Sequence, residues 1–313
     1  MSGDRPVVLV TGATGFVGRH LVPELASQGW LVRPVERRAS GAANAVLVDM
    51  IGPLTDWSAA LAGADAVVHL AARVHHPGDE SNAEIYRAVN IEGTLRLAEA
   101  AAAAGVRHFI HVSTILVNGG STDGRGPFRE SDQPAPRGIY GQTKAAAEAG
   151  LQRLAQGSAM SISIVRPPLV YGPAAGGNFG LLLRTIRRGL PLPFASIRNR
   201  RGFVAVGNLT SFIAYRLAHP GSGCEIFLVA DDEQVSTPDF IRGIAAACGG
   251  KARLFPMPMA VLTLMGRAVG RPEIRDSLIG SMEIDTSKAR TIGWRPKYSL
   301  AEGLRAAFRE PMP

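Results

Sequence analysis

The chain has 313 residues, of which 46% are hydrophobic and 19% are charged. This composition is that of a globular protein whose core needs no disulfides, and it excludes a disordered or fibrous chain. The formal net charge is +8, but the Lys and Arg residues form no long block and no aromatic stripe runs among them, so we expect no nucleic-acid partner.

The first half of the chain alternates short apolar runs with amphipathic stretches. Apolar runs rich in β-branched residues predict buried strands, and stretches with a period near 3.6 predict helices. Strands are predicted at residues 7–10, 31–35, 46–48, 66–70, 109–112 and 161–165, and helices at 16–28, 83–104 and 140–156. Gly105 would close the long Ala-rich helix. The alternation predicts an α/β fold, a Rossmann doubly wound parallel sheet with helices on both faces.

The pattern becomes less regular after the sixth predicted strand, where glycines and prolines crowd residues 172–193. We therefore predict a Rossmann domain over residues 1–172 and a smaller C-terminal substrate-binding lobe over residues 173–313. A further apolar run at 225–229 predicts a strand that returns to the main sheet.

No segment predicts export or membrane insertion. The first strand pattern follows the N-terminus without a positive and then apolar signal region, and the apolar residues 257–269 are too short to span a bilayer. Cys224 and Cys248 lack metal-ligand spacing, and two cysteines make no disulfide framework. We expect buried free thiols in a cytoplasmic protein.

A glycine-rich turn follows the first strand and opens the first helix. Gly12, Gly15 and Gly18 have the spacing G-x-x-G-x-x-G, which permits a tight turn and lets a pyrophosphate approach the helix N-terminus. This context predicts a nicotinamide dinucleotide, NAD or NADP, bound by the first domain. The intervening residues Thr14, Phe16 and Val17 are included in the predicted cofactor site.

The identity of the nicotinamide stays open at this point. Glu36 ends the second strand, where a carboxylate accepts hydrogen bonds from a ribose 2′-hydroxyl and favours NAD. Arg37 follows at once, and a guanidinium there suits the 2′-phosphate of NADP. Asp49, after the third strand, is placed to reach the adenine, with Met50 beside it.

Tyr140 and Lys144 lie four residues apart at the start of a predicted helix, so both project from one face. A phenol of ordinary pKa is a poor acid–base catalyst at neutral pH unless a cation stabilises its anion. Thr114 follows the fifth strand, where ligands of doubly wound sheets bind, and Asn90 is an amide in an otherwise apolar helix. Together these residues predict a Tyr/Lys/Thr catalytic site.

The order TGATGFVG, VVHLAA, VNIEGT, HVST, YGQTK and RPPLVYGP resembles the extended short-chain dehydrogenases, in particular the NAD-dependent epimerase/dehydratase family, over essentially the whole chain. The resemblance implies that Tyr140 is the acid–base residue, that Lys144 stabilises it, and that Thr114 orients the reacting oxygen of a UDP-sugar. It also implies further cofactor contacts at Leu70, Ala71, Ala72, Asn90 and Pro167.

The resemblance implies that two arginines, Arg201 and Arg275, grip the diphosphate of the UDP-sugar, which suits the bidentate geometry of a guanidinium. Arg73 and Asn178 are the other implied substrate residues. The adjacent histidines His75 and His76 have no carboxylate at suitable spacing, so we expect no metal site.

The sequence departs from the epimerase pattern in two places. Residues 114–119 read TILVNG where epimerases have S-x-x-V-Y-G, and Arg166 is followed by two prolines rather than by an aromatic residue and an asparagine. These variants look more like the bacterial reductases of UDP-4-keto-6-deoxy-N-acetylglucosamine, which form UDP-N-acetylquinovosamine for surface polysaccharides such as lipopolysaccharide.

The leading hypothesis is therefore a nucleotide-sugar 4-ketoreductase. A UDP-hexose 4-epimerase with tightly held NAD is the alternative that uses the same three residues. A non-catalytic cofactor sensor is a third hypothesis, which the intact Tyr/Lys/Thr set argues against. By analogy with relatives, the Ala-rich helix and the Tyr140 helix would pair in a homodimer.

Overall fold

The computed structural model describes residues 5–39, 41–42, 44–74, 82–268 and 278–309. The chain forms two compact units, each made of three separate stretches of the sequence. The first consists of Met1–Val117, Pro134–Arg166 and Thr210–Phe227, and the second of Asn118–Gln133, Pro167–Leu209 and Leu228–Pro313. The assignment of cofactor binding to residues 1–172 and of substrate binding to residues 173–313 stays a prediction.

The first unit contains a seven-stranded sheet in the order β3-β2-β1-β4-β5-β6-β9. Its strands are β1 (Val7–Thr11), β2 (Leu31–Glu36), β3 (Val46–Leu47), β4 (Ala66–His69), β5 (His108–Val112), β6 (Ser161–Arg166) and β9 (Cys224–Leu228). The neighbours from β3 through to β6 pair in parallel. Because strand order reverses between β1 and β4, the carboxyl ends of these two strands form the crevice where doubly wound sheets bind ligands. The predicted fold class is confirmed.

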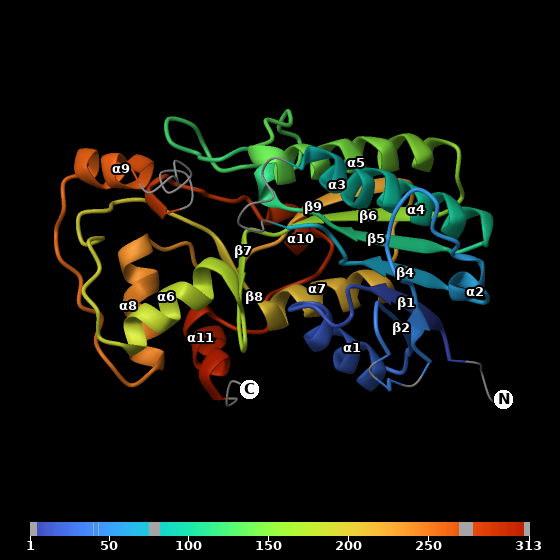
Figure 1. Ribbon diagram of the computed structural model, residues 1–313, viewed down its shortest axis with the longest axis horizontal. Coiled ribbons are helices and arrows are strands. Elements are labelled where there is room, and N and C mark those ends of the chain that lie inside the picture. The colour runs from blue at the N-terminus through green and yellow to red at the C-terminus, as the bar shows by residue number, and fades with distance from the viewer. Residues whose placement is uncertain (1–4, 40, 43, 75–81, 269–277, 310–313) are drawn as a thin grey trace. The chain divides into compact units, whose positions relative to one another are not determined.

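Helices cover both faces of this sheet. They are α1 (Gly18–Ser27), the short α2 (Ser58–Leu61), α3 (Ala83–Arg87), α4 (Gly93–Ala103), α5 (Gly138–Gln156) and α7 (Val206–Ala218). In Figure 1, α3, α4 and α5 lie over one face, and α1 and α7 lie under the other. Leu97 on α4, Phe109 on β5 and Leu151 on α5 are fully buried in one hydrophobic cluster, which stabilises this layer by about 2 kcal/mol for each side chain.

The Ala-rich stretch is helical from Ala83 to Ala103, as predicted, but one of its turns is a π-helix. A π-helix over Ala88–Glu92 separates α3 from α4. Such single turns of π-helix occur frequently at functional sites, and this one contains Asn90, which is 1% exposed. Gly105 follows the C-cap Ala104 with φ +78°, so the predicted closing glycine is confirmed.

The second unit has a parallel pair of strands, β7 (Leu169–Tyr171) and β8 (Phe203–Ala205). Its helices are α6 (Gly177–Arg187), α8 (Thr237–Ala247), α9 (Met259–Ala268), α10 (Ser287–Thr291) and α11 (Leu300–Arg309). Phe203 stacks on Phe240 with the ring centroids 3.8 Å apart. The buried carboxylate of Asp231 accepts hydrogen bonds from Tyr171 Oη at 2.7 Å and from Asn208 Nδ2 at 2.7 Å, which fixes β7 relative to the start of α7.

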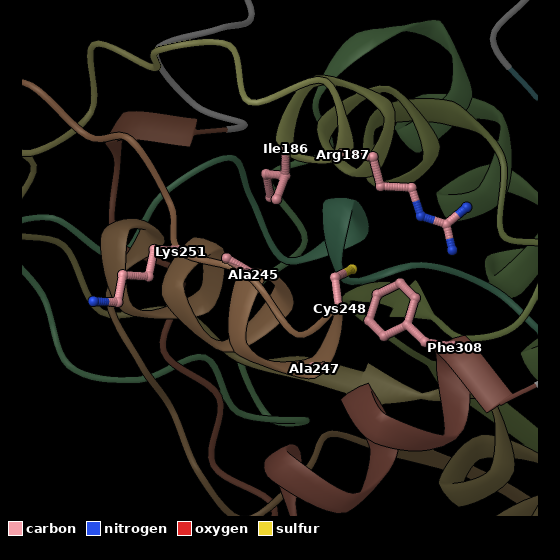
Figure 2. Close-up of a pocket in the computed structure, with 8 residues that line it drawn as sticks. Ile186, Arg187, Ala245, Ala247, Cys248, Lys251 and Phe308 are labelled. Atoms are coloured by element: carbon pink, nitrogen blue, oxygen red, sulfur yellow. The ribbon is translucent and has the colours of Figure 1, made fainter.

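A pocket of about 320 Å³ lies in the second unit between α6, α8 and α11. Its lining residues, all but Gly250 labelled in Figure 2, are Ile186, Arg187, Ala245, Ala247, Cys248, Gly250, Lys251 and Phe308. None of the residues predicted for the cofactor or the substrate is among them. Cys224 and Cys248 are both free, as predicted, but each is partly exposed rather than buried. In the described part of the chain, no helix is both long enough and apolar enough to span a bilayer.

Candidate active site

In the glycine loop between β1 and α1, the backbone segments pack so closely that a side chain at two of the glycines would collide with them. Gly12 has φ +69°, and a Cβ there would lie 2.8 Å from the amide nitrogen of Ala71. A Cβ at Gly18 would overlap the carbonyl oxygen of Gly12. Both glycines are therefore needed by the protein's own packing.

Gly15 is different, because it is exposed and has only one neighbour, the Gly12 oxygen at 3.1 Å from an added Cβ. The helix that follows begins at Gly18 and has no side-chain cap, and its Arg19 and His20 amides donate to the carbonyls of Gly15 and Val17. The positive end of the helix dipole still favours an anion at this loop. Thr14 is exposed, and Phe16 and Val17 are partly exposed beside this loop. The bare glycine and the uncapped helix fit the pyrophosphate of a dinucleotide.

The end of β2 presents the residues that bear on cofactor choice. Val35 pairs with Thr11 at the end of β1, so the next residue, Glu36, lies beside the glycine loop. The Glu36 side chain is 4% exposed, whereas Arg37 is exposed. Asp49 and Met50 follow β3 and are also exposed, Met50 by 71%.

A buried histidine connects the glycine loop to the turn after β4. His69 Nδ1 lies 2.7 Å from Thr11 Oγ1, and its Nε2 lies 2.9 Å from Thr94 Oγ1. Since the Thr94 hydroxyl donates to the Asn90 carbonyl, Nε2 must carry the ring proton and Nδ1 must accept from Thr11. Burial lowers the pKa of His69 to about 3. Thr11 Oγ1 in turn accepts from the Ala71 amide at 3.3 Å, so this neutral ring fixes the Leu70–Ala72 turn.

Asn90 connects the same turn to the helix that carries Tyr140. Its Oδ1 accepts from the Arg73 amide at 2.7 Å, and its Nδ2 donates to the Arg73 carbonyl at 3.0 Å and to Thr143 Oγ1 at 3.1 Å. Thr143 Oγ1 donates to the Tyr140 carbonyl at 3.0 Å. The amide predicted to contact the cofactor is thus occupied by bonds that join two parts of the site.

Tyr140, Lys144 and Thr114 all belong to the first unit and are placed by contacts between α5 and the short 3-10 helix Ile115–Val117. The Arg137 amide donates to the Leu116 carbonyl at 3.0 Å. A Cβ at Gly141 would lie 3.1 Å from that same oxygen. This close approach brings the start of α5 against the segment that begins at Thr114, so the predicted catalytic residues lie on facing elements.

The acid–base groups of this site have displaced pKa values. Burial raises the pKa of the Tyr140 phenol to about 12, and burial lowers the pKa of Lys144 to about 7, with the Glu148 carboxylate opposing that fall. Lys144 is 1% exposed and makes no side-chain hydrogen bond or ion pair within the described residues. A buried lysine with an unoccupied ammonium can act on a neighbouring phenolate.

Sequence reasoning missed the ion pair beneath this site. Glu148 and Arg166 are 2% exposed each, and Arg166 Nη2 lies 2.5 Å from Glu148 Oε2. Ser113 Oγ donates to Glu148 Oε1. The spacing of four residues between Lys144 and Glu148 was a visible signal, because it places both side chains on one face of the helix.

The residues predicted on the substrate side belong to both units. Arg73, in the first unit, is partly exposed. Arg201, in the second, is 6% exposed, and its Nη1 donates to the Gly280 carbonyl at 2.5 Å. Asn178 lies in the first turn of α6, and Pro167, predicted for the cofactor, is buried directly after β6. Arg275 lies outside the described residues.

His75 and His76 also lie outside the described residues. Within the described ranges, no group of three or more His, Cys, Asp or Glu side chains is arranged to hold a metal ion.

Comparison with known proteins adds four findings. A model described as the NAD dependent epimerase/dehydratase family matches residues 8–230. A UDP-glucose 4-epimerase of Vibrio cholerae is 38% identical, over 97% of this chain and 96% of that protein. A UDP-glucuronic acid 4-epimerase of Bacillus cereus, solved with NAD, is 25% identical with a TM-score of 0.77, over 96% of this chain and 94% of that one. The structure of MoeE5 with UDP-glucuronic acid and NAD is 26% identical with a TM-score of 0.77, over 96% of both chains.

Proposed function

Because the chain belongs to the NAD-dependent epimerase/dehydratase family, we propose that it catalyses hydride transfer at C4 of a UDP-sugar. The observation that carries this proposal is the buried Lys144 four residues after Tyr140, on a helix that packs against the segment following Thr114. The relatives that bind UDP-sugars support the substrate class.

The chain's own residues would handle the proton and the orientation of the sugar. When bound, the nicotinamide supplies a hydride acceptor or donor. Tyr140 would exchange a proton with the oxygen on C4, and Thr114 would hydrogen-bond that same oxygen. The Lys144 ammonium would stabilise the Tyr140 phenolate, because an opposite charge at close range favours the ionised form.

Epimerisation is the net reaction that the comparisons favour. The Vibrio cholerae relative of 38% identity is a UDP-glucose 4-epimerase. An epimerase oxidises C4, turns the keto sugar over, and reduces it from the other face. The same tyrosine then serves both half-reactions, so the cofactor stays bound through many turnovers.

Reduction of a 4-keto sugar is the second candidate, and the residues after β6 favour it. Pro167 and Pro168 are both buried there, in place of the aromatic residue and asparagine of the epimerase pattern. This departure removes a side-chain amide from the strand end at which ligands of such sheets bind. For this candidate the substrate would be UDP-4-keto-6-deoxy-N-acetylglucosamine, and a reduced cofactor would be exchanged in every cycle.

The geometry at β2 supports NAD rather than NADP for either reaction. A 2′-phosphate beside the buried Glu36 carboxylate would meet a like charge, while the ribose hydroxyls of NAD would donate to it. Arg37 is exposed, so its guanidinium does not share the buried position of the Glu36 carboxylate.

The deciding experiment is to purify the protein without added cofactor and to measure the nucleotide released on denaturation. Stoichiometric bound NAD together with interconversion of UDP-hexoses would establish the epimerase. Oxidation of added NADH or NADPH only in the presence of the UDP-4-keto sugar would establish the reductase. Inactivity of the folded protein on both substrate types would contradict the proposal.

Tyr140→Phe tests the site itself. We expect turnover to fall by about 10²–10⁴-fold, with cofactor binding retained. Tyr298→Phe is the matched control, since this tyrosine is 41% exposed in the second unit, and its turnover should equal that of the unaltered protein. A homodimer in the cytoplasm also remains our prediction.

A further inference from the structure

Four charged or polar side chains meet beneath the proposed site, and one of them has no partner of its own. Glu148 is fixed by three hydrogen bonds from Arg166, whose Nε lies 3.1 Å from Oε1 and 3.0 Å from Oε2 and whose Nη2 lies 2.5 Å from Oε2. Ser113 Oγ donates to Oε1 as well. Lys144 lies one helical turn before Glu148 and makes no ion pair with it within the described part of the chain.

The bonds to Glu148 decide what its carboxylate can do. Arg166 engages both oxygens and Ser113 engages one of them, so the carboxylate cannot turn toward Lys144 without breaking a buried bidentate pair, which is strongly unfavourable. Its charge nevertheless acts on the Lys144 ammonium through a low-dielectric interior. A direct ion pair would instead occupy the ammonium that the phenolate of Tyr140 needs.

Among the residues that the structure describes, the other groups that face Lys144 supply no negative charge. His69 on β4 and His111 on β5 are stacked 5.4 Å apart. Burial lowers the pKa of both rings and the charge of Lys144 adds to that effect, so both rings are neutral. Tyr140, on the same helix, is neutral at pH 7 because burial raises the pKa of its phenol to about 12. Arg166 on β6 is a second cation, which Glu148 neutralises. Glu148 is therefore the anion that opposes the loss of the Lys144 proton.

We propose that Glu148, held by Ser113 and Arg166, is a positioning residue that keeps Lys144 protonated from a distance and leaves its ammonium free for Tyr140. The proposal rests on the proposed function for the role of Lys144, but its charge relationship is a property of the protein alone. It can be measured without substrate or cofactor.

The chain offers a direct readout because it has four lysines, Lys144, Lys251, Lys288 and Lys297, of which only Lys144 is buried. With [ε-¹³C]lysine, each gives one NMR signal whose shift reports protonation, and Lys144→Arg assigns the buried one. The Lys144 midpoint is expected near pH 7. In Glu148→Gln it should fall by about one unit or more, since the field of an opposite charge is lost.

Controls separate charge from packing. Glu225→Gln removes the carboxylate of another arginine pair in the first unit, that with Arg216, and should leave the Lys144 midpoint unchanged. Ser113→Ala keeps the charge of Glu148 and should move the midpoint far less than Glu148→Gln. Glu148→Asp keeps a carboxylate at this position, so its Lys144 midpoint should stay close to that of the unaltered protein.

If Glu148→Gln does not fold because Arg166 loses its partner, the double variant Glu148→Gln/Arg166→Gln replaces it. A smaller fall is then expected, because the Arg166 cation, which repels the Lys144 ammonium, is lost together with the carboxylate. An unchanged Lys144 midpoint in either folded variant would overturn the proposal. A midpoint that falls in a protein inactive on every UDP-sugar would support it while contradicting the proposed function, so the two failures are distinguishable.

Discussion

Asn90 Nδ2 donates to Thr143 Oγ1 over 3.1 Å, and this bond joins the π-helix before α4 to the catalytic face of α5. The remaining bonds of the same amide go to the backbone of Arg73. One side chain therefore sets the distance between the turn beside the predicted cofactor site and the helix that carries Tyr140. This explains why a polar residue occupies the centre of a packed helix layer.

Replacing Asn90 should damage both stability and turnover. Asn90→Ala leaves the Arg73 amide and Thr143 hydroxyl without their partner, and we expect a loss of about 2 kcal/mol in unfolding free energy. Thr143→Val removes only one of the three bonds and should cost about 1 kcal/mol. Urea unfolding of both variants checks the order, and equal costs would show that the Arg73 bonds contribute nothing.

The glycines of the loop should separate into two kinds. Gly18→Ala would overlap the loop backbone and should prevent stable folding. Gly15→Ala should fold, because the added methyl would meet only the Gly12 oxygen, at 3.1 Å. Its affinity for the dinucleotide should fall by about 10-fold or more, because the methyl occupies the space that the pyrophosphate needs. Calorimetric titration with NAD measures the second effect, and unchanged affinity would place the pyrophosphate elsewhere.

Glu36 should control cofactor preference. Glu36→Gln removes a charged acceptor for the ribose and should weaken NAD(H) binding by about 10–100-fold, while improving the affinity ratio in favour of NADP(H). Arg37→Ala is the matched control, because its side chain is exposed, and its affinity for NAD(H), measured by calorimetric titration, should stay unchanged. A larger effect of Arg37→Ala on NADP(H) than of Glu36→Gln on NAD(H) would indicate an NADP enzyme.

His111 should make the fold less stable in acid. Neither ring nitrogen has a hydrogen-bond partner within the described residues, and burial holds the pKa of the ring well below its ordinary value. The unfolded chain therefore binds a proton below about pH 6.5 that the folded chain does not, so stability falls as pH decreases.

His111→Leu removes both the unpaired nitrogens and this proton. We expect unchanged or higher stability at pH 7, and a fall between pH 7 and pH 5 that is smaller than in the unaltered protein by up to about 1.4 kcal/mol per unit. Urea midpoints at the two pH values check the sign. An equally steep fall in His111→Leu would assign the acid sensitivity to His69 and His108, whose pKa values burial lowers to about 3 and about 4.

The sequence by itself determined the strand alternation, the glycine loop and the Tyr140–Lys144 spacing, because these depend on local periodicity and on residues near one another in the chain. It therefore predicted the doubly wound sheet correctly. The same periodicity could not show the π-helix at residues 88–92, since a single extra residue in a helical turn leaves the apolar pattern almost unchanged.

Only the tertiary structure decided which polar groups are paired. Glu148 and Arg166 are separated by 18 residues and Asn90 and Thr143 by 53, and nothing in either local pattern specifies such a partner. The same holds for Lys144, whose pKa is lowered mainly by burial, and the residues next to it in the sequence do not reveal that burial. Burial and partner choice are properties of packing, and packing is fixed only when distant segments meet.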